Sequence, residues 1–346
     1  MKKILSMALV AIMALGISGC QTTSKEKLKV YNWGSYIDKK VIKEFEQEYG
    51  VKVVYDEFEQ NEDLYTKVAK SAVNYDVVVP SDYMIDRLIQ EGFLAKLDKT
   101  KLSSFNEIAD KYLSPIYDKN NDYSIPYMVG TTGILYNKNM VSRPPTSWED
   151  MWNPEYTKNV LMWNSMRDTL SVGKLLLGYS VNTEDEGELQ AVKEKLIEQR
   201  PMVQAYAGDE MQDKMIAGEA AMAFMYSGDA VYCMSENEDL DYVVPKEGGN
   251  KWVDAWVILE SSASKDLAHK FIDFMCRPDI AARNMDYTGY TSGIEAAWED
   301  FDLEDEVMFP PADVLARCEV FLYSPTALQK YIDTWTEIKT GYKAIR

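Results

Sequence analysis

The spacing of apolar positions predicts alternating strands and helices in the first third of the chain. Short runs rich in β-branched and aromatic residues predict strands at residues 28–33, 51–58 and 75–80. Apolar residues at helical spacing predict helices at residues 38–50, 61–73 and 81–92. Asp38 is a good N-cap and Gly50 a good terminator for the first helix. This order predicts a mostly parallel sheet with helices on both faces, the α/β class.

A similar alternation returns after a connecting segment at residues 123–140. Strands are expected at residues 159–163, 220–226 and 241–245, and helices at 166–180, 183–199, 209–218 and 228–236. A helix at residues 263–279 and a carboxy-terminal helix at 324–339 follow. The length of 346 residues suits two lobes. Because no flexible linker separates these halves, we expect the chain to cross between two α/β lobes more than once.

The amino terminus predicts export. Lys2 and Lys3 precede an apolar run at residues 4–17, which is too short for a comfortable membrane span. The following ISGC resembles a bacterial lipobox, which implies a signal peptide at residues 1–19 and a lipid on Cys20, with a tether through residue 27. An ordinary secretory signal with Cys20 as a chance residue is the alternative. We expect an exported protein that is periplasmic or held on the outer face of the cell membrane.

The composition of the chain limits the classes of partner that it is expected to bind. The formal charge of −19 argues against nucleic acid, and the apolar fraction of 46% is that of an ordinary globular protein. The sequence has no glycine-rich phosphate loop, and we expect no cofactor. Cys233, Cys276 and Cys318 have neither CxxC spacing nor an even count, so we expect reduced, buried thiols and no metal site.

Residues 251–259, KWVDAWVIL, place one acid inside a predicted strand. Alternation along a strand sets Trp252, Asp254 and Trp256 on one face. A carboxylate between two indoles is costly unless a cation pairs with it. Neither a helix cap nor a turn explains this acid, so Asp254 is expected to meet a lysine, an arginine or a cationic ligand.

Other polar and aromatic side chains follow the ends of predicted strands, where ligands bind in open α/β sheets. They are Trp33, Ser35, Tyr36, Ser81, Asp82, Tyr83, Ser165, Asp168, Tyr226 and Asp229. The acids and serines could instead cap helices, and the aromatics could be core residues. Taken together, a cleft of rings and carboxylates suits an alkyl chain that carries ammonium groups. Sugars would need more amide and hydroxyl partners.

Several irregular stretches resemble the spermidine/putrescine-binding proteins of bacterial polyamine ABC importers. They are VYNWGSYID, YDVVVPSDYMID, NNDYSIPY, TSWEDMWNPEY, VVPKEGGNKWVD and TGYT, in this order. The resemblance implies a type II periplasmic-binding-protein fold with a hinge, no catalysis, and partnership with two permease subunits and an ATPase. Lobe 1 would comprise residues 28–134 and 254–301, and lobe 2 residues 135–253 and 302–346. We expect a monomer.

The same resemblance assigns ligand contacts to Trp33, Tyr36, Ser81, Tyr83, Trp252, Asp254 and Tyr290. Where spermidine binders carry two acids, this chain has Ser165 and Asp168. A tryptophan of the family is Tyr226 here, followed by Asp229, and a glutamine near the carboxy terminus has no clear counterpart around Phe321. The choice between diamine and triamine therefore stays open.

Two other functions are compatible with these residues. An amino-acid binder would need an arginine for the ligand carboxylate, for which Arg167 is the nearest candidate, and a sugar binder would share the fold. An extracellular hydrolase could use two of the carboxylates. The chain has one histidine, His269, expected on the polar face of its helix, which leaves little for a Ser-His-Asp site.

Overall fold

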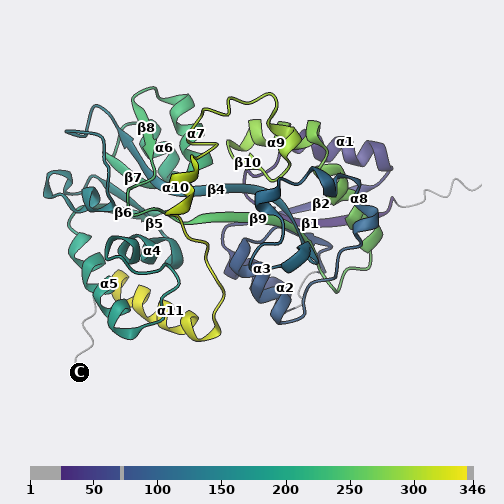
Figure 1. The fold of residues 1–346 in the computed structure, drawn as a ribbon, viewed down its shortest axis with the longest axis horizontal. Coiled ribbons are helices and arrows are strands. Elements are labelled where there is room, and N and C mark those ends of the chain that lie inside the picture. Colours follow the sequence, from purple (N-terminus) through teal and green to yellow (C-terminus); the bar gives the residue numbers. More distant parts are fainter. Residues whose placement is uncertain (1–24, 71–73, 341–346) are drawn as a thin grey trace, which may run out of the picture.

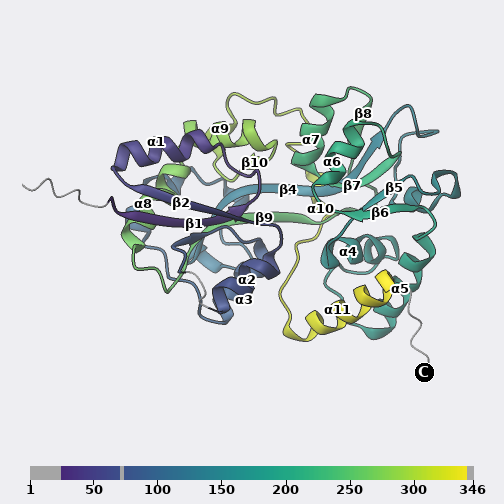
Figure 2. The same ribbon diagram turned by 180° about the vertical axis from the view of Figure 1, so that it is seen from behind.

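The computed structural model describes residues 25–70 and 74–340. The expected signal peptide and Cys20 lie outside this range. The described chain forms two α/β lobes, which confirms the predicted fold class (Figure 1). In both views, β4 (Ser124–Asn137) and β9 (Lys251–Ile258) run through the middle of the molecule from one lobe into the other (Figures 1 and 2).

The sheet of lobe 1 has the order β2-β1-β3-β9-β4, with β10 also paired to β4. Its other strands are β1 (Lys27–Trp33), β2 (Lys52–Phe58), β3 (Val77–Val78) and β10 (Thr291–Ser292). In lobe 2, β4 lies between β8 and β7, and β7 continues to β5 and β6. Those strands are β5 (Val160–Trp163), β6 (Val203–Ala207), β7 (Met222–Tyr226) and β8 (Leu240–Val243).

Strand β4 joins the two halves of the sheet. It pairs with β9 up to Thr131 and with β7 from Thr132 onward. The sequence predicts a connecting segment here, but in the structure it is a strand that is buried on both faces and so shows no polar alternation. Pairing is parallel among β1, β2 and β3 and among β5, β6 and β7, but antiparallel wherever β4 or β9 takes part. The sheet is therefore mixed, where a mostly parallel one was predicted.

Helices cover both faces of each half. In lobe 1, one face carries α1 (Lys39–Tyr49), α8 (Lys265–Met275) and α9 (Pro278–Thr288), and the other carries α2 (Asn61–Ala69) and α3 (Asp82–Gln90) (Figure 1). In lobe 2, one face carries α4 (Met166–Leu176), α5 (Glu186–Gln199) and α11 (Pro325–Thr340), and the other α6 (Glu210–Ile216) and α7 (Ser227–Glu236). The short α10 (Ala312–Ala316) precedes α11. Asp38 and Gly50 cap α1 as predicted, whereas β6 and α9 were not anticipated.

The apolar core follows these layers. One cluster lies beneath α2 and α3 and continues under α4, α5 and α11 of the other lobe, so the core is shared along one side of the molecule. Separate clusters lie under α1, α8 and α9 and under α6 and α7. Cys233, Cys276 and Cys318 are buried within the described chain and form no disulfide there, as expected. Among the helices described, none is long and apolar enough to span a bilayer.

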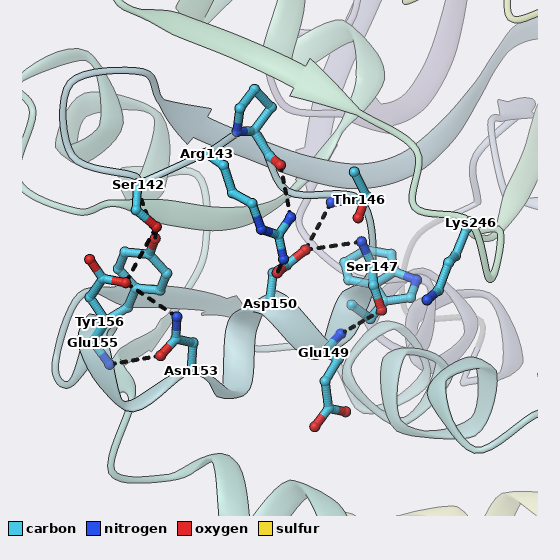
Figure 3. Close-up of polar contacts among 12 residues, drawn as sticks. Ser142, Arg143, Thr146, Ser147, Glu149, Asp150, Asn153, Glu155, Tyr156 and Lys246 are labelled. Atoms are coloured by element: carbon cyan, nitrogen blue, oxygen red, sulfur yellow. Dashed lines mark hydrogen bonds and ion pairs between the residues drawn. The ribbon is translucent and has the colours of Figure 1, made fainter.

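The TSWEDMWNPEY motif builds a corner held by polar contacts (Figure 3). Ser147 precedes a 3-10 helix (Trp148–Trp152), and its hydroxyl oxygen accepts from the Glu149 amide at 3.1 Å. Asp150 Oδ2 accepts from the Ser147 amide in return. The same serine hydroxyl donates to Glu247 Oε1 at 2.5 Å, which ties this corner to the segment before β9.

His269 is buried, contrary to the prediction that it lies on a polar helix face. Helix α8 packs against residues 99–107 as well as against the sheet, so little of its surface remains for solvent. His269 Nε2 accepts from the Asp98 amide at 2.9 Å, and Nδ1 lies 2.7 Å from the Lys265 carbonyl oxygen. Both ring nitrogens are thus engaged by backbone.

Candidate ligand-binding site

The predicted site residues converge where the two lobes meet. Trp33 ends β1 and Tyr226 ends β7, while Ser81 and Ser165 immediately precede α3 and α4. Strand β9 supplies its residues from the centre of the sheet, where it lies between β3 and β4. The strand ends of both lobes therefore face one shared region, as the rule for open α/β sheets predicts.

Four aromatic rings form a continuous wall in this region. Trp252 lies 5.0 Å from Tyr290 and 6.2 Å from Tyr226 between ring centroids, and Tyr290 lies 5.6 Å from Tyr36. Each pair is edge-to-face, the arrangement that the ring quadrupoles favour. Gly228 allows this packing, because a Cβ there would lie 2.5 Å from the Tyr290 ring. The rings offer π-faces that suit methylene groups or ammonium ions.

Asp254 is the least satisfied acid of the site. Its side chain belongs to a residue only 5% exposed, and Oδ1 has no hydrogen-bond partner within the described chain. Burial raises the pKa of Asp254 to about 7, although the nearby Ser81 and Tyr36 hydroxyls oppose this rise. The Tyr36 hydroxyl is also without a partner in the described chain. Such a carboxylate is costly to keep ionised unless a cation joins it.

Asp82 is a second buried acid beside Asp254. It is 1% exposed and accepts from the amides of Tyr83, at 2.7 Å, and Val253, at 3.4 Å. Burial raises its pKa well above the usual range, and the charge of Asp254 raises it further. Ser81 is the residue before α3, but its hydroxyl makes no cap and instead accepts from Asn61 Nδ2 at 3.1 Å. These two acids concentrate negative charge at one end of the aromatic wall.

Asp229 and Asp168 supply carboxylates from lobe 2. The Tyr290 hydroxyl donates to Asp229 Oδ1 at 2.9 Å, which links the lobes, and burial raises the pKa of Asp229 to about 7. The Ser165 hydroxyl donates to Asp168 Oδ2 at 2.5 Å and does not cap α4. Burial also raises the pKa of Asp168. A capping box at this helix, the simpler explanation of these two residues, is therefore not formed.

Glu62 and Arg167 surround Tyr83 on the other side of the region. The Tyr83 hydroxyl donates to Glu62 Oε1 at 3.2 Å, and the guanidinium carbon of Arg167 lies 4.1 Å from the centre of the Tyr83 ring. Sequence reasoning did not propose Glu62 as a site residue. Its position in the first turn of α2, where the helix dipole favours acids, gave no reason to single it out.

Three other predicted residues, Trp33, Ser35 and Trp256, differ in their burial. Trp33 is half-buried and packs on Phe58 with centroids 4.3 Å apart. Ser35 is exposed. Trp256 is fully buried between Tyr127 and Phe271 and forms part of the core beneath the site. Over residues 25–70 and 74–340, no group of three or more His, Cys, Asp and Glu side chains is arranged to hold a metal ion.

Comparison with known proteins matches this chain to solute-binding proteins. Residues 40–311 match the family model described as bacterial extracellular solute-binding protein. The spermidine/putrescine-binding periplasmic protein of Salmonella typhimurium is 34% identical over 334 residues, covering 95% of this chain and 96% of that protein.

Two solved structures share the fold over nearly the whole chain. One, from Listeria monocytogenes and assigned to a spermidine/putrescine ABC transporter, has a TM-score of 0.88 and 37% identity, covering 92% of this chain and all of that one. The other is the spermidine/putrescine ABC transporter substrate-binding protein PotD of Streptococcus pneumoniae, in complex with calcium and HEPES. It has a TM-score of 0.81 and 35% identity, covering 91% and 99%.

Proposed function

The chain belongs to the bacterial extracellular solute-binding protein family, and on that premise we propose that it captures a polyamine, spermidine or putrescine, for an ABC importer. The single observation that carries the choice of ligand is Asp254. It is a buried carboxylate with an oxygen that lacks a partner in the described chain, set against an aromatic wall. An ammonium group would supply the missing charge and hydrogen bonds.

The site divides into two parts that fit the two ends of such a ligand. Asp254 and Asp82 would hold one ammonium, and Asp168 would meet the other. Asp229 keeps Tyr290 in place and adds negative charge. The aromatic wall, with Trp33, Tyr36, Ser81 and Tyr83, would line the methylene chain between them. No step of this binding changes the ligand chemically.

Delivery of the ligand to an importer would require particular partners and a location outside the cytoplasm. The proposed partners are two permease subunits and their ATPase, approached by a monomer held on the outer face of the membrane through a lipid on Cys20. The ISGC sequence and the family, which is extracellular, support export. A lobe boundary near residue 134 is consistent with the change of β4 partners after Thr131.

Arg167 does not favour an amino-acid ligand. Its guanidinium covers the Tyr83 ring, and Nη1 donates to the Leu322 carbonyl oxygen at 3.4 Å. Its charge acts on Asp82 and Asp168, which are both buried, and Asp254 lies near Asp82; these acids would repel a ligand carboxylate. The charge of the site therefore favours a cation.

A thermal-shift panel tests the proposed ligand class. We expect putrescine or spermidine at saturating concentration to raise the unfolding midpoint by a few °C, because a ligand that binds only the folded state stabilises it. Glutamine and maltose, as representatives of amino acids and sugars, should leave the midpoint unchanged. A shift with either of these and none with the amines would refute the proposal.

A further inference from the structure

We propose that Glu62 is a further ligand-binding residue, which holds the second ammonium of the ligand together with Asp168 from across the cleft. This inference rests on the proposed function, since it concerns the far end of the same ligand. It makes Glu62 a determinant of specificity for amines charged at both ends.

The two carboxylates come from opposite lobes. Glu62 lies in the first turn of α2 in lobe 1, and Asp168 lies in the first turn of α4 in lobe 2. The Tyr83 hydroxyl donates to Glu62 Oε1 at 3.2 Å, which directs the Glu62 carboxylate toward the aromatic residues of the site. On the other side, the Ser165 hydroxyl fixes Asp168 Oδ2 at 2.5 Å. The Tyr83 hydroxyl orients Glu62, and the Ser165 hydroxyl, with that of Tyr226 nearby, orients Asp168. Both carboxylates keep acceptor capacity for a ligand.

The two acids are close enough to interact. Burial raises the pKa of Asp168, and the charge of Glu62 raises it further. Glu62 also raises the pKa of Tyr83, after the larger effect of burial. Two carboxylates that face each other from separate lobes repel unless a cation lies between them.

Arg167 does not provide that cation. Within the described chain it makes no ion pair of 4.0 Å or less with Glu62 or Asp168. It is 6% exposed, lies over the Tyr83 ring and has an Nε without a partner in that chain. Arg167 therefore lies over the Tyr83 ring without an ion pair to either acid, and Glu62 and Asp168 keep acceptor capacity for a cation from solution.

Glu62 and Asp168 should affect the closure of the two lobes as well as the affinity for the ligand. Bringing the lobes together around a ligand with one ammonium would leave Glu62 and Asp168 opposed and uncompensated. A ligand with an ammonium at each end would relieve this repulsion. Recognition of the second charge is therefore coupled to closure.

The test compares three purified variants by calorimetry with putrescine. Glu62→Gln keeps the shape but removes the charge, and we expect it to weaken binding by about tenfold or more. Asp63→Asn removes the same charge from the exposed neighbouring position of α2 and should bind within about twofold of the unmodified protein. Tyr83→Phe removes the hydroxyl but keeps both acids, and should lose clearly less than Glu62→Gln. Urea unfolding would verify that each variant is folded.

Equal losses in Glu62→Gln and Tyr83→Phe would overturn the inference, because Glu62 would then act only by positioning Tyr83. Equal affinities of Glu62→Gln and Asp63→Asn would overturn it as well. Both outcomes leave the proposed function intact. Failure of the unmodified protein to bind putrescine and spermidine would instead remove the proposed function and this inference with it.

Discussion

At the scale of single residues, the site is defined by carboxylates that are buried and have raised pKa values. Asp254 lies close enough to Asp82 for its charge to raise the pKa of Asp82, and Asp229 and Asp168 come from the other lobe. Each has a raised pKa because burial disfavours its charged form. The unliganded site therefore takes up protons that a bound ammonium would displace.

Affinity should consequently depend on pH. Burial raises the pKa of Asp254 and that of Asp229 to about 7, so both lose protons as the pH rises through 7. The ligand amines stay charged, since alkyl ammonium groups titrate near pH 10. We expect affinity at pH 6 to be about tenfold lower than at pH 8 for each carboxylate that must ionise. Titration calorimetry across this range measures it, and an affinity that is flat or higher at pH 6 would contradict the assignment.

Some of these residues could be predicted from sequence and others could not. Asp254 could, because strand alternation puts it beside Trp252 and no cap explains it. The same alternation puts Trp256 on that face, but Trp256 is fully buried in the core between Tyr127 and Phe271. Glu62 was missed because its role depends on the distance to Tyr83 and to Asp168, which are 21 and 106 positions away in the chain.

At the scale of elements, short helices are easier to predict than the strands between the lobes. Asp38 and Gly50 define α1 through local chemistry alone. Strand β4 has no polar face, so its sequence does not distinguish a buried strand from a connection. The antiparallel pairing of β4 and β9 also depends on partners distant in the chain. Periodicity within a segment carries no information about such partners.

The start of α7 should be sensitive to side-chain volume. A Cβ on Gly228 would lie 2.5 Å from the Tyr290 ring, so Gly228→Ala should displace Tyr290 and break its hydrogen bond to Asp229. We expect polyamine affinity to fall by about tenfold or more. Gly187, at the equivalent second position of α5 but exposed, is the matched control. Unchanged affinity in Gly228→Ala would show that Tyr290 is not required.

The corner at Ser147 should affect stability and not binding. Ser147→Ala removes the bond to Glu247 Oε1 and the acceptor for the Glu149 amide. Loss of such a cap costs about 1 to 2 kcal/mol of unfolding free energy. Urea unfolding measures this loss, and calorimetry should give unchanged polyamine affinity. A large loss of affinity in a folded variant would contradict the structural role of this motif.

At the scale of the whole molecule, two lobes touch across a site rich in negative charge. Tyr290 bonds to Asp229, and Arg167 covers Tyr83, so contacts on two sides hold the lobes together. The chain links the lobes through β4 and β9, which run through the centre, and through residues 299–311, which cross along one side (Figure 1). This arrangement suits a hinge.

Closure should therefore respond to ligand. Repulsion among the carboxylates favours separated lobes in the absence of a cation, and a polyamine removes that repulsion. We expect the radius of gyration from small-angle X-ray scattering to fall on addition of putrescine or spermidine, toward the value calculated from this structure. A radius that is already at this value and does not change would contradict ligand-driven closure.

The most direct test of the central claim is isothermal titration calorimetry of the unmodified protein and of Asp254→Asn with putrescine and spermidine. We expect saturable binding of at least one amine and a loss of about 100-fold or more in the variant, since the amide cannot supply the charge. The same titration ranks the two amines. Undiminished binding by Asp254→Asn would contradict the claim that this carboxylate holds the ligand.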